Sequence, residues 1–315
     1  MFANDVEEKP FNRIERSEVY RKALDIDSSA SFGTQLDYSD IKLLHSMFPI
    51  AKSDIVPFKL VFGEERNIEN TFTIHKPMII SGMSFGALGE NAVRALARGA
   101  KQAGIPMNTG EGGHPKYHMM ESDQLIFQMG TAKFGVRHPD GRLDEKKLRA
   151  LSAQPQIRMI EIKLSQGAKP GKGGLLPKEK ITEEIAELRG VERGKDVIFP
   201  SYHVECTDVT HTVQFISHVQ EVSQLPVGIK FCLGRLDEVR QLFQEMKNQN
   251  QFPDFITIDG AEGGTGAAPK SFMDEVGTPL LRALPQVHQL LIDMGIRNRL
   301  KILASGKLIN AGKQL

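Results

Sequence analysis

The sequence has few cysteines, almost no net charge and no long apolar run, and each shortage excludes a class of protein. Cys206 and Cys232 have no CxxC spacing and no flanking histidine pair, which argues against a disulfide framework or a cysteine-ligated zinc site. Lys plus Arg (40) nearly equals Asp plus Glu (39), so we expect no bulk electrostatic binding to nucleic acid or to a membrane. No run approaches the roughly 18 apolar residues of a membrane span, and residues 1–30 contain no hydrophobic signal core. We therefore expect a soluble, cytoplasmic protein.

Short apolar segments alternate with amphipathic ones from residue 72 onward. We count seven strand-then-helix units, which begin at Met78, Ile105, Met159, Val197, Val227, Phe255 and Ile302. An irregular section at 112–140 separates the second unit from the third and contains one possible strand, TAKFGV. Such alternation predicts a parallel sheet in an α/β fold.

Units of this length fit a (β/α)8 TIM barrel, about 250 residues long, better than an open doubly wound sheet. A barrel needs eight units, and the sequence reaches Leu315 before an eighth is found. We therefore expect an incomplete barrel over residues 71–315 that lacks its last βα unit. Residues 1–70 are expected to form an N-terminal extension that packs on it.

The stretch DFITIDGAEGGTGAAP, residues 254–269, combines a short β-branched strand with a glycine-rich loop. Glycine lets the backbone adopt positive φ and approach a ligand, so consecutive N–H groups can surround an anion. One interpretation is therefore a phosphate site, and the other is an ordinary loop between a strand and a helix. The GxGxxG spacing is absent from this stretch, which argues against a dinucleotide fold. A second glycine-rich stretch, GAKPGKGG at residues 167–174, does not fit the P-loop motif, because three residues rather than four separate its glycines and Gly173 stands where Ser or Thr is needed.

Polar side chains follow most of the expected strands, at the end where barrels place their active sites. Lys163 and Lys230 lie in apolar strands, EIKLS and GIKFC, and should point into the mouth of the barrel. A buried ammonium needs an anionic partner, which can be a ligand or a structural carboxylate; the candidates for the latter are Glu111, Glu161 and Glu262. His203 could act as an acid, as a base or as a core residue. The two cysteines are expected to be small buried side chains rather than nucleophiles.

Three long segments resemble the FMN-binding domain of glutamate synthase, and its shorter single-module branch in particular. They are MSFGALGENAVRALARGAKQAGIPMNTGEGG, IEIKLSQGAKPGKGGLLP and IDGAEGGTGAAP, and the similarity runs from about Pro77 to Gly312. The resemblance implies a (β/α)8 barrel that binds FMN. It also implies that 2-oxoglutarate and ammonia form 2-iminoglutarate, which a hydride from flavin N5 reduces to L-glutamate.

The resemblance also assigns roles to individual residues. The expected substrate and catalytic residues are Glu111, Lys163, Gln166 and Lys169, with the lysines pairing with the two carboxylates of the substrate. Lys230 would neutralise negative charge on the reduced flavin ring. The other expected cofactor-binding residues are Ser81, Gly82, Met83, Ser84, Asn108, Gly263, Gly264, Thr265, Gly306 and Lys307, the last five near the phosphate.

Two departures from the large glutamate synthases bear on function. Those enzymes have SGHDGGTGA in place of residues 259–267 and Asp-Gly-Gly in place of residues 305–307, so a His and an Asp are missing here. The clustered cysteines that hold the family's iron–sulfur cluster are also absent, and no metal site is expected. Ammonia, whether free or derived from glutamine by another subunit, and electrons from a ferredoxin or a pyridine-nucleotide reductase would have to come from partners.

Three hypotheses remain open at this point. The first is an FMN oxidoreductase of the glutamate synthase type. The second is an FMN barrel that acts on a different 2-oxo or imino acid. The third is a truncated, non-catalytic fragment that associates with itself, because an incomplete barrel has unpaired strand edges.

Overall fold

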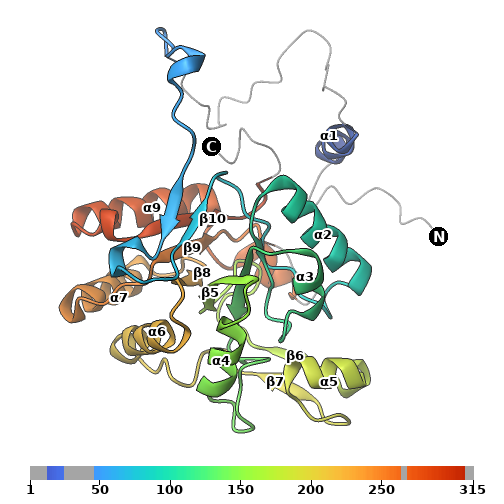
Figure 1. Ribbon diagram of the computed structural model, residues 1–315. Coiled ribbons are helices and arrows are strands. Elements are labelled where there is room, and N and C mark those ends of the chain that lie inside the picture. Colours follow the sequence, from blue (N-terminus) through green and yellow to red (C-terminus); the bar gives the residue numbers. More distant parts are fainter. Residues whose placement is uncertain (1–12, 25–45, 264–267, 309–315) are drawn as a thin grey trace. The chain divides into compact units, whose positions relative to one another are not determined.

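The computed structural model describes residues 13–24, 46–263 and 268–308 (Figure 1). The chain divides into two compact units, one made of residues Met1–Val56 with Lys307–Leu315 and the other of Pro57–Gly306. The first unit contains α1 (Arg13–Ala23) and the short helix η1 (Lys52–Asp54). Everything described below belongs to the second unit. The expected domain boundary at residue 70 stays a prediction.

A curled sheet of six parallel strands forms half of a barrel (Figure 1). Its order is β10 (Lys301–Ser305), β9 (Phe255–Asp259), β8 (Val227–Phe231), β5 (Ile157–Lys163), β4 (Leu125–Met129) and β3 (Met107–Asn108). A parallel bridge between Ile80 and Met107 continues the sheet beyond β3. The strands of this sheet follow one another in chain order, with β6 and β7 left out between β5 and β8, as in a barrel wound in one direction. The predicted α/β barrel-type fold is confirmed.

Helices pack on the outside of this sheet. The longer ones are α2 (Glu90–Ala103), α4 (Glu145–Ser152), α6 (Val209–Ser223), α7 (Leu236–Gln249) and α9 (Leu280–Asp293). Four of them, α4, α6, α7 and α9, contact one another in sequence along one face (Figure 1). Side chains of Asp144, Thr182 and Asp208 cap the first turns of α4, α5 (Glu183–Arg189) and α6 by accepting backbone N–H bonds. The shorter helices are α3 (Lys116–Glu121), α5 (Glu183–Arg189), α8 (Lys270–Glu275), η2 (Glu64–Arg66), η3 (Lys178–Lys180) and η4 (Arg297–Arg299).

One expected barrel strand was assigned wrongly and another was missed. The strand expected at Val197 is β7 (Val197–Phe199), which pairs antiparallel with β6 (Gly174–Leu176) outside the main sheet. The third barrel strand is instead β4, in the section read as irregular, and the TAKFGV segment beside it consists of turns. A short apolar run does not reveal whether it pairs within a buried sheet or in a surface hairpin. The two errors compensate, so β9 is still the sixth strand from Ile80 onward.

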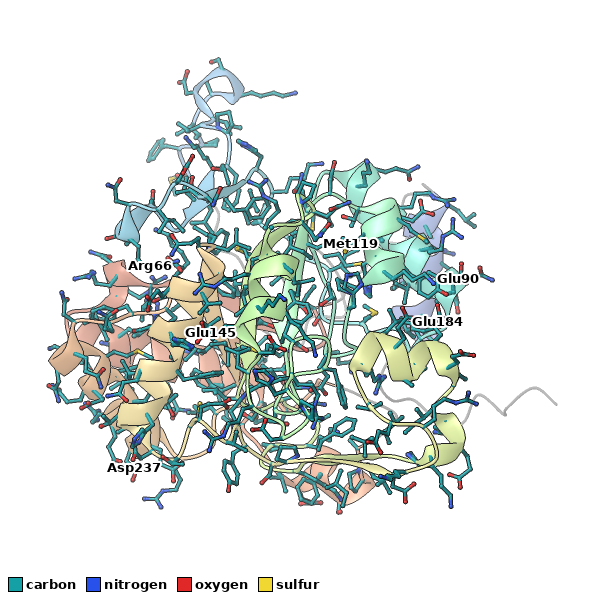
Figure 2. All side chains as sticks on the ribbon, turned by 60° about the horizontal axis from the view of Figure 1, so that its bottom comes forward. Arg66, Glu90, Met119, Glu145, Glu184 and Asp237 are labelled. Carbon is teal, nitrogen blue, oxygen red and sulfur yellow. The ribbon has the colours of Figure 1, made fainter. Side chains whose placement is uncertain are left out.

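An antiparallel hairpin, β1 (Leu60–Phe62) and β2 (Phe72–Ile74), packs on the amino ends of the strands. The aromatic rings of Phe62 and Phe255 meet edge to face, with their centroids 5.5 Å apart. These rings share one buried cluster with Phe72, Ile74, Ile126 and Met159. Arg66, labelled in Figure 2, follows β1 and binds Asp254 just before β9 at 2.9 Å. The amino end of the half-barrel is thus closed by apolar side chains, which leaves the carboxyl end for polar chemistry.

Candidate active site

The register of the sheet places Lys163 of β5 directly beside Lys230 of β8, at the carboxyl ends of the two strands. Side chains two residues apart on a strand share a face, so Glu161 lies on the same face as Lys163, one step nearer the middle of the sheet. Thr257 is the partner of Lys230 in β9, and Asp259 follows it on the same face. Two lysines and two carboxylates therefore meet inside the half-barrel.

Lys163 forms an ion pair with Glu111, with 2.7 Å between Nζ and Oε1, and also donates to the side-chain oxygen of Gln166. Glu111 lies in the loop after β3, and a Cβ on Gly130 would sit 2.1 Å from its Oε2. Burial raises the pKa of Glu111, but the nearby charges of Lys163, Lys169 and Arg189 outweigh it and hold the pKa below its usual value. Of the two partners expected for Lys163, a ligand or a structural carboxylate, the structure contains the carboxylate, and it is Glu111.

A pocket with a cavity volume of about 30 Å³ opens beside this ion pair. Its lining consists of Glu111, Thr131, Lys163, Leu164, Ser165, Gln166, Lys169, Gly171, Lys172, Gly173 and Phe199. Burial lowers the pKa of the Lys169 ammonium, Glu111 opposes this change, and Lys163 and Lys172 add to it. All four residues expected to contact the substrate therefore surround one small, predominantly cationic pocket.

Lys230 has a looser partner than Lys163. Its Nζ lies 3.5 Å from Oδ2 of Asp259, which also accepts the backbone N–H of Gly167 at 2.8 Å. Gly167 and Gly260 touch so closely that a Cβ on Gly167 would lie 1.7 Å from the Gly260 oxygen. The loops that follow β5 and β9 are therefore held backbone to backbone around Asp259 and Lys230.

The residues expected to contact a flavin occupy neighbouring loops. A Cβ on Gly82 would lie 2.9 Å from Oδ1 of Asn108, and one on Gly110 would lie 2.8 Å from the Ser84 nitrogen. His118 donates to the carbonyl oxygen of Met83 at 2.9 Å, which anchors this loop, and Ser81 at its start is exposed. The segments 81–84 and 108–110 thus pack with no room for additional side chains.

The expected phosphate residues are only partly described. Gly263 donates its N–H to the Gly260 oxygen at 2.9 Å, and a Cβ on Gly306 would lie 3.4 Å from Gly260. Gly264 and Thr265 lie outside the described residues. Lys307 belongs to the other compact unit, so its expected role stays a prediction.

Arg189, at the end of α5, was not selected from the sequence. Its guanidinium is buried, donates to the Phe85 oxygen at 3.3 Å and lies 5.1 Å from the centre of the Phe134 ring. A basic residue in the last turn of a helix ordinarily interacts with that helix's own carbonyl groups, so its sequence position gave no sign of this role. Asp259 was not predicted either, because it directly precedes a glycine-rich loop whose glycines, and not the aspartate, carried the predicted function.

His203 is a core residue rather than an exposed acid or base. Its side chain is buried, and Nε2 donates to the Lys163 carbonyl oxygen at 3.0 Å. Burial and then the charge of Lys133 lower its pKa to about 4, so the ring is neutral at physiological pH. Burial raises the pKa of Cys206 to about 11 and also raises that of Cys232, which leaves both thiols protonated and unreactive.

Residues 13–24, 46–263 and 268–308 contain no group of three or more His, Cys, Asp or Glu side chains that could hold a metal ion. No helix within these ranges has both the length and the apolar character needed to cross a membrane.

Comparison with known proteins adds a family to this geometry. A family model described as a conserved region in glutamate synthase matches residues 30–314. The glutamate synthase large subunit-like protein YerD of Bacillus subtilis is 35% identical, over 99% of this chain and 67% of its own length. The archaeal glutamate synthase (NADPH) of Methanocaldococcus jannaschii is 37% identical, over 73% of this chain and 42% of its own length. The chain thus spans about two thirds of the first relative and less than half of the second.

The flavin-binding domain of baker's yeast flavocytochrome b2 superimposes with a TM-score of 0.46 and 14% identity, over 80% of this chain and 57% of the other. That superposition is too loose to support a functional comparison.

Proposed function

Because the chain belongs to the glutamate synthase family, as the resemblance predicted, we propose that it is an FMN-dependent oxidoreductase that reduces 2-iminoglutarate to L-glutamate. The observation that carries this proposal is the pocket at the carboxyl end of β5, where Lys163 and Lys169 face the single carboxylate of Glu111. An excess of ammonium groups in a small, partly buried pocket suits a substrate with two carboxylates.

The donor set beside the pocket suits FMN. A flavin needs close backbone approach, hydrogen-bonding groups around the ring and a cation near its N1–C2 edge. Gly82 and Gly110 let the segments 81–84 and 108–110 lie closely against each other, which supports the first requirement, and the polar amides of Asn108 and Gln128 lie beside these segments, which supports the second. Lys230 meets the third requirement. Among the described residues its ammonium has one ionic partner, Asp259, and at 3.5 Å this contact is loose enough to leave the cation available to the ring.

Bound FMN would supply the hydride that reduces the C=N bond of the imine. The residues of this chain would bind and orient the substrate. Lys169, whose pKa is lowered, and Lys163 would pair with its carboxylates, and Lys163 would exchange part of its contact with Glu111 for the substrate. Glu111, kept ionised, would accept a hydrogen bond from a cationic imine nitrogen.

We propose that the electrons come from a partner protein and that the nitrogen arrives as ammonia. Iron–sulfur clusters are held by sets of about four cysteine thiolates, and this sequence has two cysteines, both with a raised pKa. The residues present therefore do not fit such a cluster, and no electron-transfer step is assigned to this chain. A ferredoxin or a pyridine-nucleotide reductase would reduce the flavin, and ammonia would be free or produced from glutamine elsewhere.

The test has two stages. Purified protein should take up FMN one to one, with a visible absorbance that bleaches on reduction. The reduced protein should then be reoxidised by 2-oxoglutarate plus ammonium and yield glutamate. A colourless protein that does not bind added FMN would refute the proposal. Reoxidation by other 2-oxo acids with ammonium, but not by 2-oxoglutarate, would instead favour a related enzyme with a different substrate.

A further inference from the structure

Glu161 is a buried carboxylate at the centre of the half-barrel that the function proposed above does not use. It lies on β5 and is 2% exposed. Three side chains from three other strands donate to it: Asn108 Nδ2 at 2.8 Å, Gln128 Nε2 at 2.8 Å and Thr257 Oγ1 at 2.6 Å. All three donors are neutral, and no lysine or arginine of the described residues forms an ion pair with it. A carboxylate without a countercharge is costly to bury, so its presence requires a reason.

One consequence of the charge is a fixed orientation of two amides. An ionised carboxylate only accepts hydrogen bonds, so Asn108 and Gln128 must turn their NH2 groups toward it. The oxygen of Asn108 then faces the other way and accepts the N–H of Gly110 at 2.9 Å. A neutral group at position 161 could accept or donate and would not impose this orientation.

The same amides lie against the segment proposed to hold the flavin. A Cβ on Gly82 would be 2.9 Å from the Asn108 oxygen and 3.2 Å from the Gln128 nitrogen. Glu161 is also two residues before Lys163 on the same face of β5, and it faces Gly228, two residues before Lys230. The buried negative charge is thus one step below the site's lysines and directly behind its amides.

We propose that Glu161 is a positioning residue that fixes the amides of Asn108 and Gln128 behind the flavin-side glycine Gly82 and whose charge lowers the flavin's reduction potential. This inference rests on the proposed function, because it requires FMN in the half-barrel. A fixed negative charge in a low-dielectric interior disfavours a ring that gains electrons. The negative charge of Glu161 therefore acts against the positive charge of Lys230, which favours the reduced ring. The reduction potential of the flavin would then lie between the values that each charge alone would give.

Glu161→Gln isolates the charge. The remaining oxygen can still accept both amides, and the new NH2 can donate to the Thr257 hydroxyl, so every hydrogen bond keeps a partner. We expect FMN uptake to persist and the protein to prefer reduced over oxidised flavin at least about tenfold more than the wild type does. For a two-electron couple this is an upward shift of about 30 mV in a spectroelectrochemical titration.

The matched control is Glu238→Gln on α7, whose side chain is 65% exposed, so this substitution removes the same charge at the protein surface. Its potential should equal that of the wild type. Equal potentials for Glu161→Gln and this control would overturn the inference.

Thr257→Val provides a second route if Glu161→Gln does not fold. It retains the charge but removes one donor, so the carboxylate is less compensated and the flavin potential should fall. An unchanged or raised potential would overturn the inference. If the wild type binds no FMN, the proposed function fails and this inference fails with it. If the wild type binds FMN and neither variant responds, only the inference fails.

Discussion

The contact between Gly167 and Gly260 provides a sharp test of how the candidate site is held together. Gly167 lies in the loop after β5 and Gly260 in the loop after β9, and the N–H of Gly167 also donates to Asp259. Replacement of Gly167 by alanine would insert a methyl group 1.7 Å from the Gly260 oxygen. Real Cβ atoms do not approach other atoms closer than 3.0 Å, so the two loops must separate by at least the difference, 1.3 Å.

The energetic cost can be estimated from its parts. Overpacking of a well-packed site costs about 1–3 kcal/mol. Loss of the hydrogen bond to the Asp259 carboxylate costs roughly 1.5–3 kcal/mol. The lower chain entropy of alanine in the unfolded state returns about 0.5–1 kcal/mol. We therefore expect Gly167→Ala to lower the free energy of unfolding by about 2–5 kcal/mol.

Urea unfolding followed by circular dichroism would measure this change, and FMN uptake would report on the site. The control is Gly99→Ala on the exposed side of α2, where no atom lies within 4 Å of the added Cβ. A helical glycine replaced by alanine should stabilise the protein by about 1 kcal/mol. The two variants should thus shift the unfolding midpoint in opposite directions. A Gly167→Ala protein within about 0.5 kcal/mol of the wild type, the range of ordinary surface substitutions, would refute the close approach of the two loops.

Four other changes should have distinct effects. Lys230→Ala should weaken FMN binding or lower the flavin potential, because the cation that favours the reduced ring is lost; unchanged binding and potential would remove Lys230 from the site. Glu111→Gln should destabilise the fold by about 1–3 kcal/mol in urea titrations, less than a fully buried pair because Lys163 and Glu111 are partly exposed. Phe62→Ala, at a fully buried position, should cost about 3–5 kcal/mol, and a loss below 1 would contradict the closed amino end. The pKa of His203 is lowered to about 4 in the folded protein, whereas in the unfolded chain it is near 6.5. Between these two pH values only the unfolded chain binds the proton, so the free energy of unfolding decreases as the pH falls through this range. The loss reaches roughly 3 kcal/mol, and His203→Gln, which keeps a donor for the Lys163 carbonyl, should flatten this part of the pH–stability curve; an unchanged slope would contradict a neutral buried ring.

Much of the fold could be predicted because strand-then-helix alternation is a local property of sequence. The exceptions show where local signals fail. Ile198 in β7 resembles a buried strand residue but is 77% exposed, because β7 pairs only with β6. β4 is buried along its whole length, yet Gln128 interrupts its apolar run, because that amide is needed inside the half-barrel by Glu161.

The candidate site could be predicted in part for a related reason. Strand ends converge in a barrel, so Lys163 and Lys230 were predicted from their strand positions, whereas Lys169 was assigned through the resemblance. Their partners depend on contacts between distant segments, which no pattern encodes. Glu111 lies 52 residues from Lys163, and Gly167 lies 92 residues from Asp259. The sequence suggested possible carboxylates but could not select Glu111 for one lysine and Asp259 for the other.

The segment between β5 and β8 has a consequence for how this protein could diversify. These strands are neighbours in the sheet, yet residues 164–226 separate them and contain β6, β7, α5 and α6. Most residues that line the pocket, from Leu164 to Phe199, come from the first part of this single insertion. Substrate preference could therefore change by replacement of one continuous segment. The sheet, the loops at 81–84 and 108–110 and the closed amino end would stay unchanged. A graft of residues 164–208 between relatives is the natural unit for exchanging specificity within this scaffold.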